Sequence, residues 1–447
     1  MTKLFLYKIT SFVILFLLFI NLSRAQTAQT AEEYFYRAID NAGWSNYLGA
    51  LRDFNRAIEL DSTFADAYYL RGDAKSKLGD FNGAIRDFTK ASELKAFDAE
   101  IFYDRALVYV NLRLFNLAFD DFNKSIELNP ASDRTYFTRG VLKQYILEDF
   151  NGAIEDYNQV INLSPKDADS HYNRALAKIK IGAYDSAVVD FKRAYTFNHY
   201  NDEYFFAQKN LEIFIDSLKV LNSTIESNPR NGDAYTNRGK QKIKVELFES
   251  ALDDFTKAIE LNPNDAKAFL LRGNVKTIRG SFAEAIDDYN MAISKAPTDP
   301  EMFFRRGALK HHFPNDYEGA INDYNKALDL DKNNIFYILS RGDAKTANKK
   351  YKDAIEDYSK AIELQPDNLT CYIKRGDAKV LAFDFEGAIA DYSKVIELNP
   401  KEAIAYYKRG LAKHRIDKIE EACIDLSFAG ELGYTEVYKV ISSYCNR

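Results

Sequence analysis

The chain has 447 residues, of which 46% are hydrophobic and 28% are charged, and its formal net charge at pH 7 is −6. This composition predicts a folded protein with a large surface. The acidic balance argues against nucleic acid as a partner, because that function requires clustered Lys and Arg side chains to displace counterions. Aromatic residues are abundant, with 30 Tyr and 32 Phe against one Trp, and so many rings need a packing explanation.

Residues 1–25 have the composition of an export signal. Two lysines precede the apolar run Phe12–Ile20, and small residues occupy the −3 and −1 positions before Gln26. We therefore expect a signal peptide and an exported mature protein, which would be periplasmic, outer-membrane-associated or secreted. The apolar run is shorter than the roughly 20 residues that cross a bilayer, so no membrane span is expected after cleavage. An uncleaved anchor is the alternative.

Nearly everything after residue 30 repeats the pattern of Ile335–Asn368. This stretch predicts two amphipathic helices, and the second runs from about Tyr351 to Leu364. Gln365-Pro366 ends it, because proline cannot continue a helix and restricts the residue before it. Alignment on this pattern gives twelve repeats: 31–64, 65–98, 99–132, 133–167, 168–201, 202–231, 232–265, 266–299, 300–334, 335–368, 369–402 and 403–436.

A period of 34 residues in a helix–turn–helix unit is the signature of the tetratricopeptide repeat (TPR) family, which this chain resembles over about nine-tenths of its length. The resemblance implies an all-α fold, a right-handed α-solenoid of about twelve repeats in which each repeat buries its apolar face against its neighbours. We expect repeats 1–5 within 26–201, a degenerate repeat at 202–231, repeats 7–12 at 232–436, and a capping helix at 437–447.

Three positions, counted from the first residue of each repeat, predict the core. Position 8 is Gly or Ala and position 20 is Ala in the regular repeats, whereas position 24 is Phe or Tyr in all of them but the last, which has Leu426. Small residues let the two helices approach closely, and the rings fall on one helical face. Because the ring recurs at a core position, we interpret it as core and not as a stacking surface for bases or sugars.

Two charged positions recur in eleven repeats. Position 7 is Arg: Arg37, Arg71, Arg105, Arg139, Arg174, Arg238, Arg272, Arg306, Arg341, Arg375 and Arg409. Position 23 is Asp: Asp53, Asp87, Asp121, Asp156, Asp190, Asp254, Asp288, Asp323, Asp357, Asp391 and Asp425. A catalytic carboxylate would not be copied into every repeat, so we expect structural ion pairs. The first repeat keeps its Arg and the last keeps its Asp, which predicts that each pair closes within one repeat.

The sixth repeat, 202–231, breaks the pattern. It is four residues short, and it lacks both the Arg and the Asp, with Val220 where the Asp should fall. We expect it to be a weak joint or hinge, because it interrupts the nearest-neighbour coupling of a solenoid.

No catalytic or cofactor motif occurs in the sequence. The phosphate-binding patterns GxGxxG and GxxxxGK[ST] are absent, and no Cys or Ser lies in a nucleophile motif. The adjacent His311 and His312 point in different directions on a helix, so a solvated or groove-lining pair is favoured over a zinc site. The repeats leave no room for a catalytic domain. We therefore expect a protein that is not an enzyme and has no cofactor or metal.

The three cysteines predict one disulfide. Cys423 falls on the second helix of the last repeat and Cys445 on the capping helix beside it, and export makes oxidation possible. Cys371 is expected to stay free.

In the resembled family, first-helix positions 2, 5, 9 and 12 line the concave groove. Repeats 3 to 5 are apolar at several of these positions, whereas a solvent-exposed surface with no binding role would be polar there. We expect a ligand groove there, with aromatic anchors around aliphatic residues; the alternative is that the rings pack in the core. The candidates are Tyr103, Leu107, Val110, Phe137, Val141, Tyr172, Leu176 and Ile179.

Two classes of function remain. The first is a non-catalytic scaffold of the cell envelope or periplasm that binds a protein or an extended peptide in its concave groove. The second is a structural or self-assembling component of an envelope complex, in which repeat stacking continues between molecules.

Overall fold

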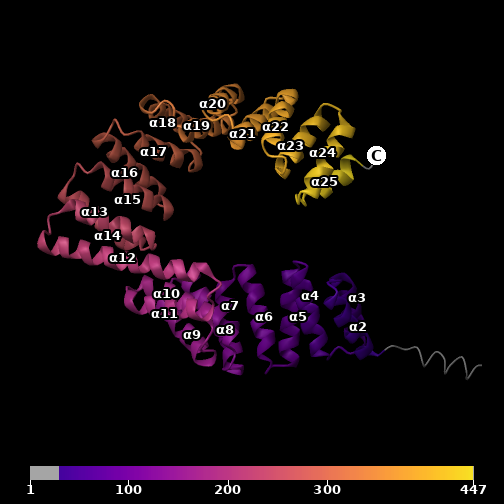
Figure 1. Ribbon diagram of the computed structural model, residues 1–447. Helices are drawn as coiled ribbons and strands as arrows, with labels where there is room; N and C mark the ends of the chain where they lie inside the picture. The colour runs from indigo at the N-terminus through magenta and orange to yellow at the C-terminus, as the bar shows by residue number, and fades with distance from the viewer. Residues whose placement is uncertain (1–29, 446–447) are drawn as a thin grey trace, which may run out of the picture. The chain divides into compact units, whose positions relative to one another are not determined.

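The computed structural model describes residues 30–445, and every regular element in that range is a helix. The predicted all-α solenoid of helix–turn–helix repeats is confirmed (Figure 1). The chain divides into two compact units, one ending at Ile213 and the other beginning at Phe214. The predicted signal peptide lies outside the described residues. Among the helices that are described, none is long and apolar enough to cross a membrane.

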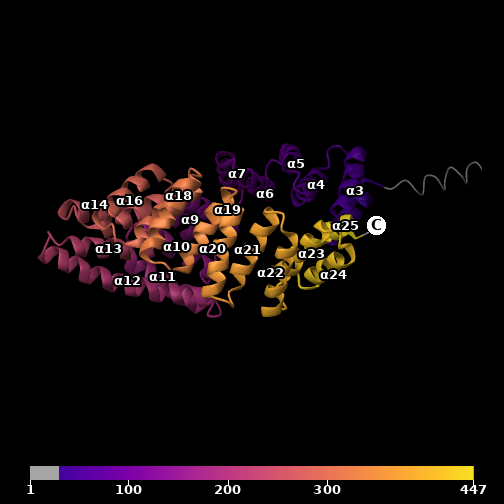
Figure 2. The same ribbon diagram turned by 90° about the horizontal axis from the view of Figure 1, so that it is seen from above.

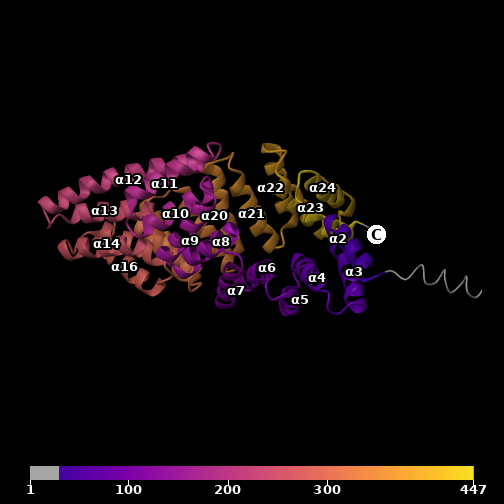
Figure 3. The ribbon, with the colours of Figure 1, turned by 90° about the horizontal axis from the view of Figure 1, so that it is seen from below.

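The first unit contains five complete repeats, whose helices follow one another in chain order (Figure 3). The first helices are α2 (Ala31–Gly43), α4 (Ala65–Lys77), α6 (Ala99–Asn111), α8 (Asp133–Leu142) and α10 (Ala168–Lys180). The second helices are α3 (Tyr47–Leu60), α5 (Phe81–Leu94), α7 (Phe115–Leu128), α9 (Phe150–Leu163) and α11 (Tyr184–Phe197). A π-helical segment, Lys143–Leu147, extends α8 where the fourth repeat has its extra residue.

The second unit contains six complete repeats and the capping helix α25 (Val437–Tyr444), and Figure 2 shows α19 to α23 side by side. The first helices are α13 (Gly232–Lys244), α15 (Ala266–Ile278), α17 (Pro300–His312), α19 (Ile335–Ala347), α21 (Leu369–Leu381) and α23 (Ala403–Arg415). The second helices are α14 (Phe248–Leu261), α16 (Phe282–Lys295), α18 (Tyr317–Leu330), α20 (Tyr351–Leu364), α22 (Phe385–Leu398) and α24 (Ile419–Glu431).

The turn inside each complete repeat depends on one residue with left-handed backbone. This residue stands at position 15, or at position 16 in the two repeats with an extra residue. Its φ is positive in all eleven repeats, whether it is Gly, as at Gly79 and Gly280, or another residue, as at Lys349 and Phe383. Such a residue stops the first helix and reverses the chain. Every complete repeat therefore turns at the same place and with the same left-handed backbone conformation.

The helix pair closes over the predicted core positions. Gly342 on α19 lies against the ring of Tyr358 on α20, and a Cβ built on Gly342 would come within 2.7 Å of that ring. Tyr358 and Ala354 on α20 are buried. Position 8 therefore has to be small because the ring at position 24 occupies the space beside it.

The Arg–Asp pairs close within one repeat, as predicted. In the tenth repeat, Nε and Nη2 of Arg341 donate to the two carboxylate oxygens of Asp357 at 3.0 and 2.6 Å. The bidentate pairing recurs in all eleven repeats. Asp357 also has a second cationic partner that was not predicted, because the amine of Lys345 at position 11 lies 2.8 Å from it. A Lys at position 11 makes this contact in nine repeats.

The same arginine also joins neighbouring repeats. Nη1 of Arg341 donates to Oδ1 of Asn325, which lies at position 25 of the preceding repeat, at 2.8 Å. Asn, Thr or Ser at position 25 accepts this bond in ten places along the chain. The pair is thus intra-repeat, while the guanidinium as a whole couples one repeat to the one before it.

The sixth repeat is a single helix in place of a helix pair. Helix α12 (Asp202–Ser227) is continuous over 26 residues, and its sequence contains neither Gly nor Pro. Losing four residues removes the turn with its left-handed position, so nothing ends the helix. In the second unit, Oδ1 of Asn222 on α12 accepts a hydrogen bond from Nη1 of Arg238. Asn222 therefore makes the same contact to the following repeat as the position-25 residues of the complete repeats. The degenerate repeat is therefore still joined to the repeat that follows it.

The last repeat is covered by α25. Val437 is fully buried against Leu426 and Ala429 of α24, in a cluster that Tyr407 and Tyr444 also contact. A disulfide joins Cys423 to Cys445, with their Cα atoms 5.8 Å apart. Cys371 is a free, buried thiol.

Candidate ligand-binding surface

The three aromatic residues that we predicted as groove anchors are half-buried, and each contacts the core ring of its own repeat. The ring centroids of Tyr103 and Phe122 are 5.8 Å apart, those of Phe137 and Tyr157 6.0 Å, and those of Tyr172 and Phe191 5.3 Å. Polar neighbours engage two of the rings as well. Tyr172 donates to Glu203 at 2.7 Å, and the guanidinium of Arg134 lies 4.1 Å from the centroid of the Tyr103 ring. These rings therefore serve packing, with only part of each surface open to a ligand.

The aliphatic members of the predicted groove divide into two groups. Leu107 and Val110 pack against the core cluster around Phe122, and they remain partly exposed, as do Val141 and Leu176. Ile179 is only 6% exposed. Its inclusion among the ligand contacts needs correction, because a side chain so buried packs in the core and offers a ligand almost no surface.

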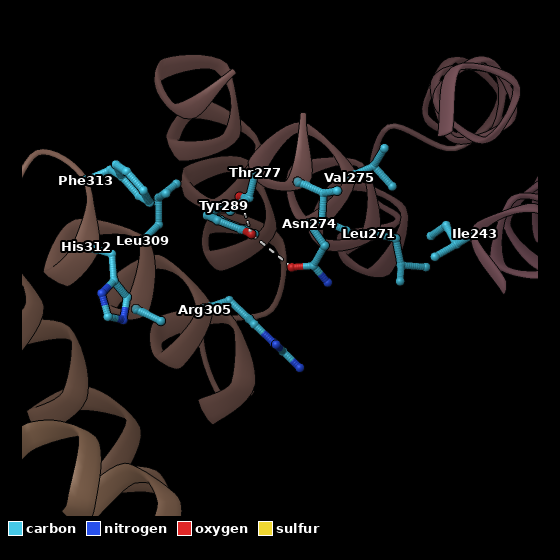
Figure 4. Close-up of a pocket in the computed structure, with 12 residues that line it drawn as sticks. Ile243, Leu271, Asn274, Val275, Thr277, Tyr289, Arg305, Leu309, His312 and Phe313 are labelled. Atoms are coloured by element: carbon cyan, nitrogen blue, oxygen red, sulfur yellow. Dashed lines mark hydrogen bonds between the residues drawn. The ribbon is translucent and has the colours of Figure 1, made fainter. Parts of the chain in front are cut away.

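A better-formed hollow lies on the second unit, between the first helices of repeats 7, 8 and 9 (Figure 4). It has a volume of about 500 Å³. Its apolar lining comes from Ile243 of α13, Leu271, Val275 and Ile278 of α15, and Ala308, Leu309 and Phe313 in and just after α17. Sequence reasoning missed this pocket. The sequence signal that could have indicated it was the set of aliphatic residues Leu271, Val275 and Ile278 in α15, together with Ala308 in α17.

One wall of the pocket presents an oriented amide. The hydroxyl of Tyr289 donates to Oδ1 of Asn274 at 2.9 Å and lies 3.0 Å from the hydroxyl of Thr277. These contacts fix the Asn274 side chain with its oxygen toward the tyrosine, as Figure 4 shows. Its Nδ2 atom has no hydrogen-bond acceptor among the described residues, so it can donate to a ligand carbonyl.

The opposite wall carries positive and titratable groups. Arg305 and His312, both on α17, line this wall (Figure 4). Nη2 of Arg305 contacts Glu301 one helical turn earlier, at 3.1 Å, and both side chains are about half-exposed. On the same helix, burial lowers the pKa of His311, and the neighbouring His312 lowers it further. His311 is therefore held neutral at physiological pH.

The corresponding surface of repeats 10 to 12 is occupied by the chain's own ion pairs. Asp343 accepts from the hydroxyl of Tyr358 and from the amine of Lys374 in the next repeat, each at 2.8 Å. Asp377 holds Tyr392 and Lys408 in the same way, each at 2.7 Å. In repeat 8, Asn274 stands at this position and Ala308 is its counterpart in repeat 9, so no such ion pair crosses the hollow.

The pocket can therefore hold an apolar side chain and hydrogen-bond the backbone next to it. Among residues 30–445, no cluster of three His, Cys, Asp or Glu side chains is arranged to hold a metal ion. The polar groups present are suited to binding, because they comprise an amide donor, a guanidinium and an imidazole around an apolar floor.

The fold and this pocket define a helical repeat array with a ligand-sized hollow on its first-helix face. Models of one family match seven stretches of the chain. Residues 142–182, 342–380 and 384–417 match as "TPR repeat", and residues 65–98, 99–132, 236–300 and 312–334 match as "Tetratricopeptide repeat". The chain belongs to the tetratricopeptide repeat family.

Comparison with individual proteins adds little beyond the family. No curated protein matches the chain. Similar solved structures include YrrB, a TPR protein with an unusual peptide-binding site, at 21% identity over 41% of this chain and 95% of that one, with a TM-score of 0.38. A TPR protein from Parabacteroides merdae is 20% identical over 62% and 99%, with a TM-score of 0.36. The Cut9–Hcn1 complex is 13% identical over 93% and 97%, with a TM-score of 0.37.

Proposed function

We propose that this protein is a non-catalytic scaffold that binds an extended segment of another protein on its first-helix face. The pocket between α13, α15 and α17 takes an apolar side chain of that segment. The observation that carries this proposal is the oriented amide of Asn274 beside an apolar hollow of about 500 Å³. Membership of the TPR family supports a protein-binding role in general.

The proposed recognition combines shape with backbone hydrogen bonding. A Leu, Ile or Phe side chain would contact Leu271 and Leu309, while Asn274 Nδ2 donates to a backbone carbonyl of the same segment. Arg305 favours an acidic residue near the bound side chain, because it can exchange Glu301 for a ligand carboxylate. The helices are packed in place before binding, so most of the ordering entropy falls on the peptide.

A selection experiment tests this proposal and does not require the natural partner to be identified first. Peptides from a random phage-displayed library would be selected on the folded protein, and the tightest would be titrated against variants. Leu271→Asp should weaken binding by at least about tenfold, because a buried charge replaces an apolar contact. Met291→Asp, on the exposed side of α16, serves as the matched control. Equal affinities for the two variants would place the site elsewhere.

The first-helix face of the first unit is a second candidate surface. Here Tyr103, Phe137 and Tyr172 remain the proposed anchors around Leu107, Val141 and Leu176, with Val110 at the edge. Because the rings also contact core aromatics, Tyr103→Phe is the more informative change than Tyr103→Ala. It removes the hydroxyl while keeping the packed ring, so lower affinity at unchanged melting temperature would support a ligand contact.

We also propose that the protein is exported and acts in the cell envelope, at the periplasmic or outer-membrane face or outside the cell. The residues before Gln26 support this proposal. Mass analysis of protein from the source cells should find Gln26 as the first residue. Met1 on envelope material would contradict cleavage.

A further inference from the structure

The outward face of α24 departs from every other complete repeat. Position 26 is basic in most repeats and forms an ion pair with the acid at position 29. Seven repeats have this pair: Arg56–Glu59, Lys90–Glu93, Lys124–Glu127, Lys257–Glu260, Lys326–Asp329, Lys360–Glu363 and Lys394–Glu397. In the last repeat the acid remains as Glu431, but the base is replaced by Phe428.

This replacement belongs to an exposed apolar stripe. Ile424, Phe428 and Leu432 are spaced i, i+4, i+8 along α24 and its C-cap, and their exposed fractions are 57%, 48% and 39%. Leu is common at position 30, but no other complete repeat has apolar residues at both positions 22 and 26. The stripe is about 12 Å long at the helical rise of 1.5 Å per residue. The capping helix does not bury it, since it remains exposed with α25 in place.

Two acidic residues border the stripe. Glu420 lies one turn before Ile424, and Glu431 lies one turn after Phe428, so both flank the apolar residues on the same part of the helix surface. Both are exposed, and neither forms an ion pair within the part of the chain that the structure describes. Glu421, by contrast, pairs with Lys413 at 3.2 Å.

We propose that this face, defined by Ile424, Phe428 and Leu432, docks an amphipathic helix of another protein whose apolar stripe is flanked by Lys or Arg. A straight ridge of side chains at i, i+4, i+8 fits a helical partner by ridge-into-groove packing. The partner's cations pair with Glu420 and Glu431, which replaces the ion pair that seven other repeats make internally. A cation can also lie over the open face of Phe428, whose ring contacts Tyr406 at 5.7 Å.

The same charges disfavour a second copy of this chain as the occupant. Two copies packed stripe to stripe would bring Glu420 and Glu431 of one molecule against the same acids of the other, and like charges in an interface oppose association. This surface is separate from the pocket on α15 and α17, so the inference does not depend on the function proposed above.

Binding of synthetic helical peptides to the full, disulfide-intact chain tests the proposal. The probe is a fluorescent amphipathic peptide of Leu and Lys, compared with a Leu and Glu peptide of the same pattern and with a scrambled Leu–Lys peptide. Only the patterned Leu–Lys peptide should bind. Phe428→Lys restores the usual ion pair with Glu431 and so should fold normally, yet it should lower affinity by at least about tenfold.

Met291→Lys makes the same change at position 26 of repeat 8, and it should alter affinity by less than about twofold. Glu431→Gln should weaken binding of the Lys peptide without exposing new apolar surface. Equal binding of the scrambled peptide, or equal losses in Phe428→Lys and Met291→Lys, would overturn the proposal. Concentration-dependent dimerisation that Phe428→Lys abolishes would also overturn it, in favour of a second copy.

Discussion

Arg341 and Asp357 form a two-fold hydrogen-bonded ion pair inside one repeat, and the remaining guanidinium nitrogen of Arg341 bonds Asn325 in the repeat before. Asp357 is only 4% exposed. One buried carboxylate therefore holds the two helices of its repeat together and orients the group that couples the repeat to its neighbour. Because the ion pair recurs in every complete repeat, it is the main polar element of the solenoid.

Removing the carboxylate should be strongly destabilising. Asp357→Ala leaves Arg341 and Lys345 without their shared partner, and breaking a buried pair in this way costs about 3–5 kcal/mol. Asn325→Ala should cost less, about 1.5–3 kcal/mol, since it removes one hydrogen bond to a charged group. Urea unfolding of both variants measures the difference. A larger loss for Asn325→Ala would mean that coupling between repeats outweighs closure within them.

At position 8, replacing Gly by Ala should destabilise the protein, which is the opposite of the usual effect of this substitution in a helix. Gly→Ala in a helix normally stabilises by about 0.5–1 kcal/mol. At Gly342 the new methyl group would meet the Tyr358 ring at 2.7 Å, so overpacking should give a net loss of about 1–3 kcal/mol. Gly43→Ala is the control, because nothing lies within 4 Å of its Cβ position. Thermal unfolding should show opposite signs, and a stabilised Gly342→Ala would refute the close contact.

Lowering the pH should remove the contribution of Asp190 to the free energy of unfolding. Burial alone would raise the pKa of this carboxyl group, but the basic groups of His171, Arg174 and Lys178 lower it well below its ordinary value. A carboxylate with a depressed folded-state pKa stabilises the protein fully above its unfolded-state pKa, and the stabilisation is lost as pH falls towards the folded-state value. The difference in melting temperature between wild type and Asp190→Asn should thus shrink below about pH 4. A difference constant from pH 7 to pH 2 would contradict this.

Much of the fold could be predicted because its determinants are local and repeated. The bounds of α20 follow from Tyr351 and from Pro366, and the Arg–Asp pairing followed from the co-occurrence of both residues. The Lys at position 11 and the Asn at position 25 were equally visible as repeats, but nothing in the family resemblance pointed to them. The pocket at Leu271 was not predicted, because the aliphatic residues of α15 were visible in the sequence but the hollow depends on how side chains from three helices leave a space unfilled. Ile179 was misplaced because position 12, which is partly exposed in most repeats, is buried in the fourth and fifth repeats.

The terminal disulfide should act locally. Cys445→Ser frees α25 from α24, and removing a native disulfide typically costs about 2–4 kcal/mol. Hydrogen exchange should show faster opening of Val437–Tyr444, with little change in the first unit. Exchange that rises uniformly along the chain would instead indicate a global role for the bond.

Helix α12 is predicted to open before the repeats on either side of it. It lacks the Arg–Asp pair and the turn, and several of its apolar side chains are exposed, including Phe206 at 58% and Val220 at 67%. Native-state hydrogen exchange should place residues 202–231 among the least protected. Protection equal to that of α10 and α14 would show that the continuous helix compensates for the missing pair.

The most direct test of the proposed function is to locate a bound peptide on the surface. A photo-reactive p-benzoylphenylalanine would replace Ala308, which lines the pocket, and in a second sample Lys326, on the exposed face of α18. A library-selected peptide would be added and irradiated, and the cross-links mapped by mass spectrometry. We predict cross-linking at 308 that unlabelled peptide competes away, with none at 326. Cross-linking only at 326, or equally at both positions, would contradict binding on the first-helix face.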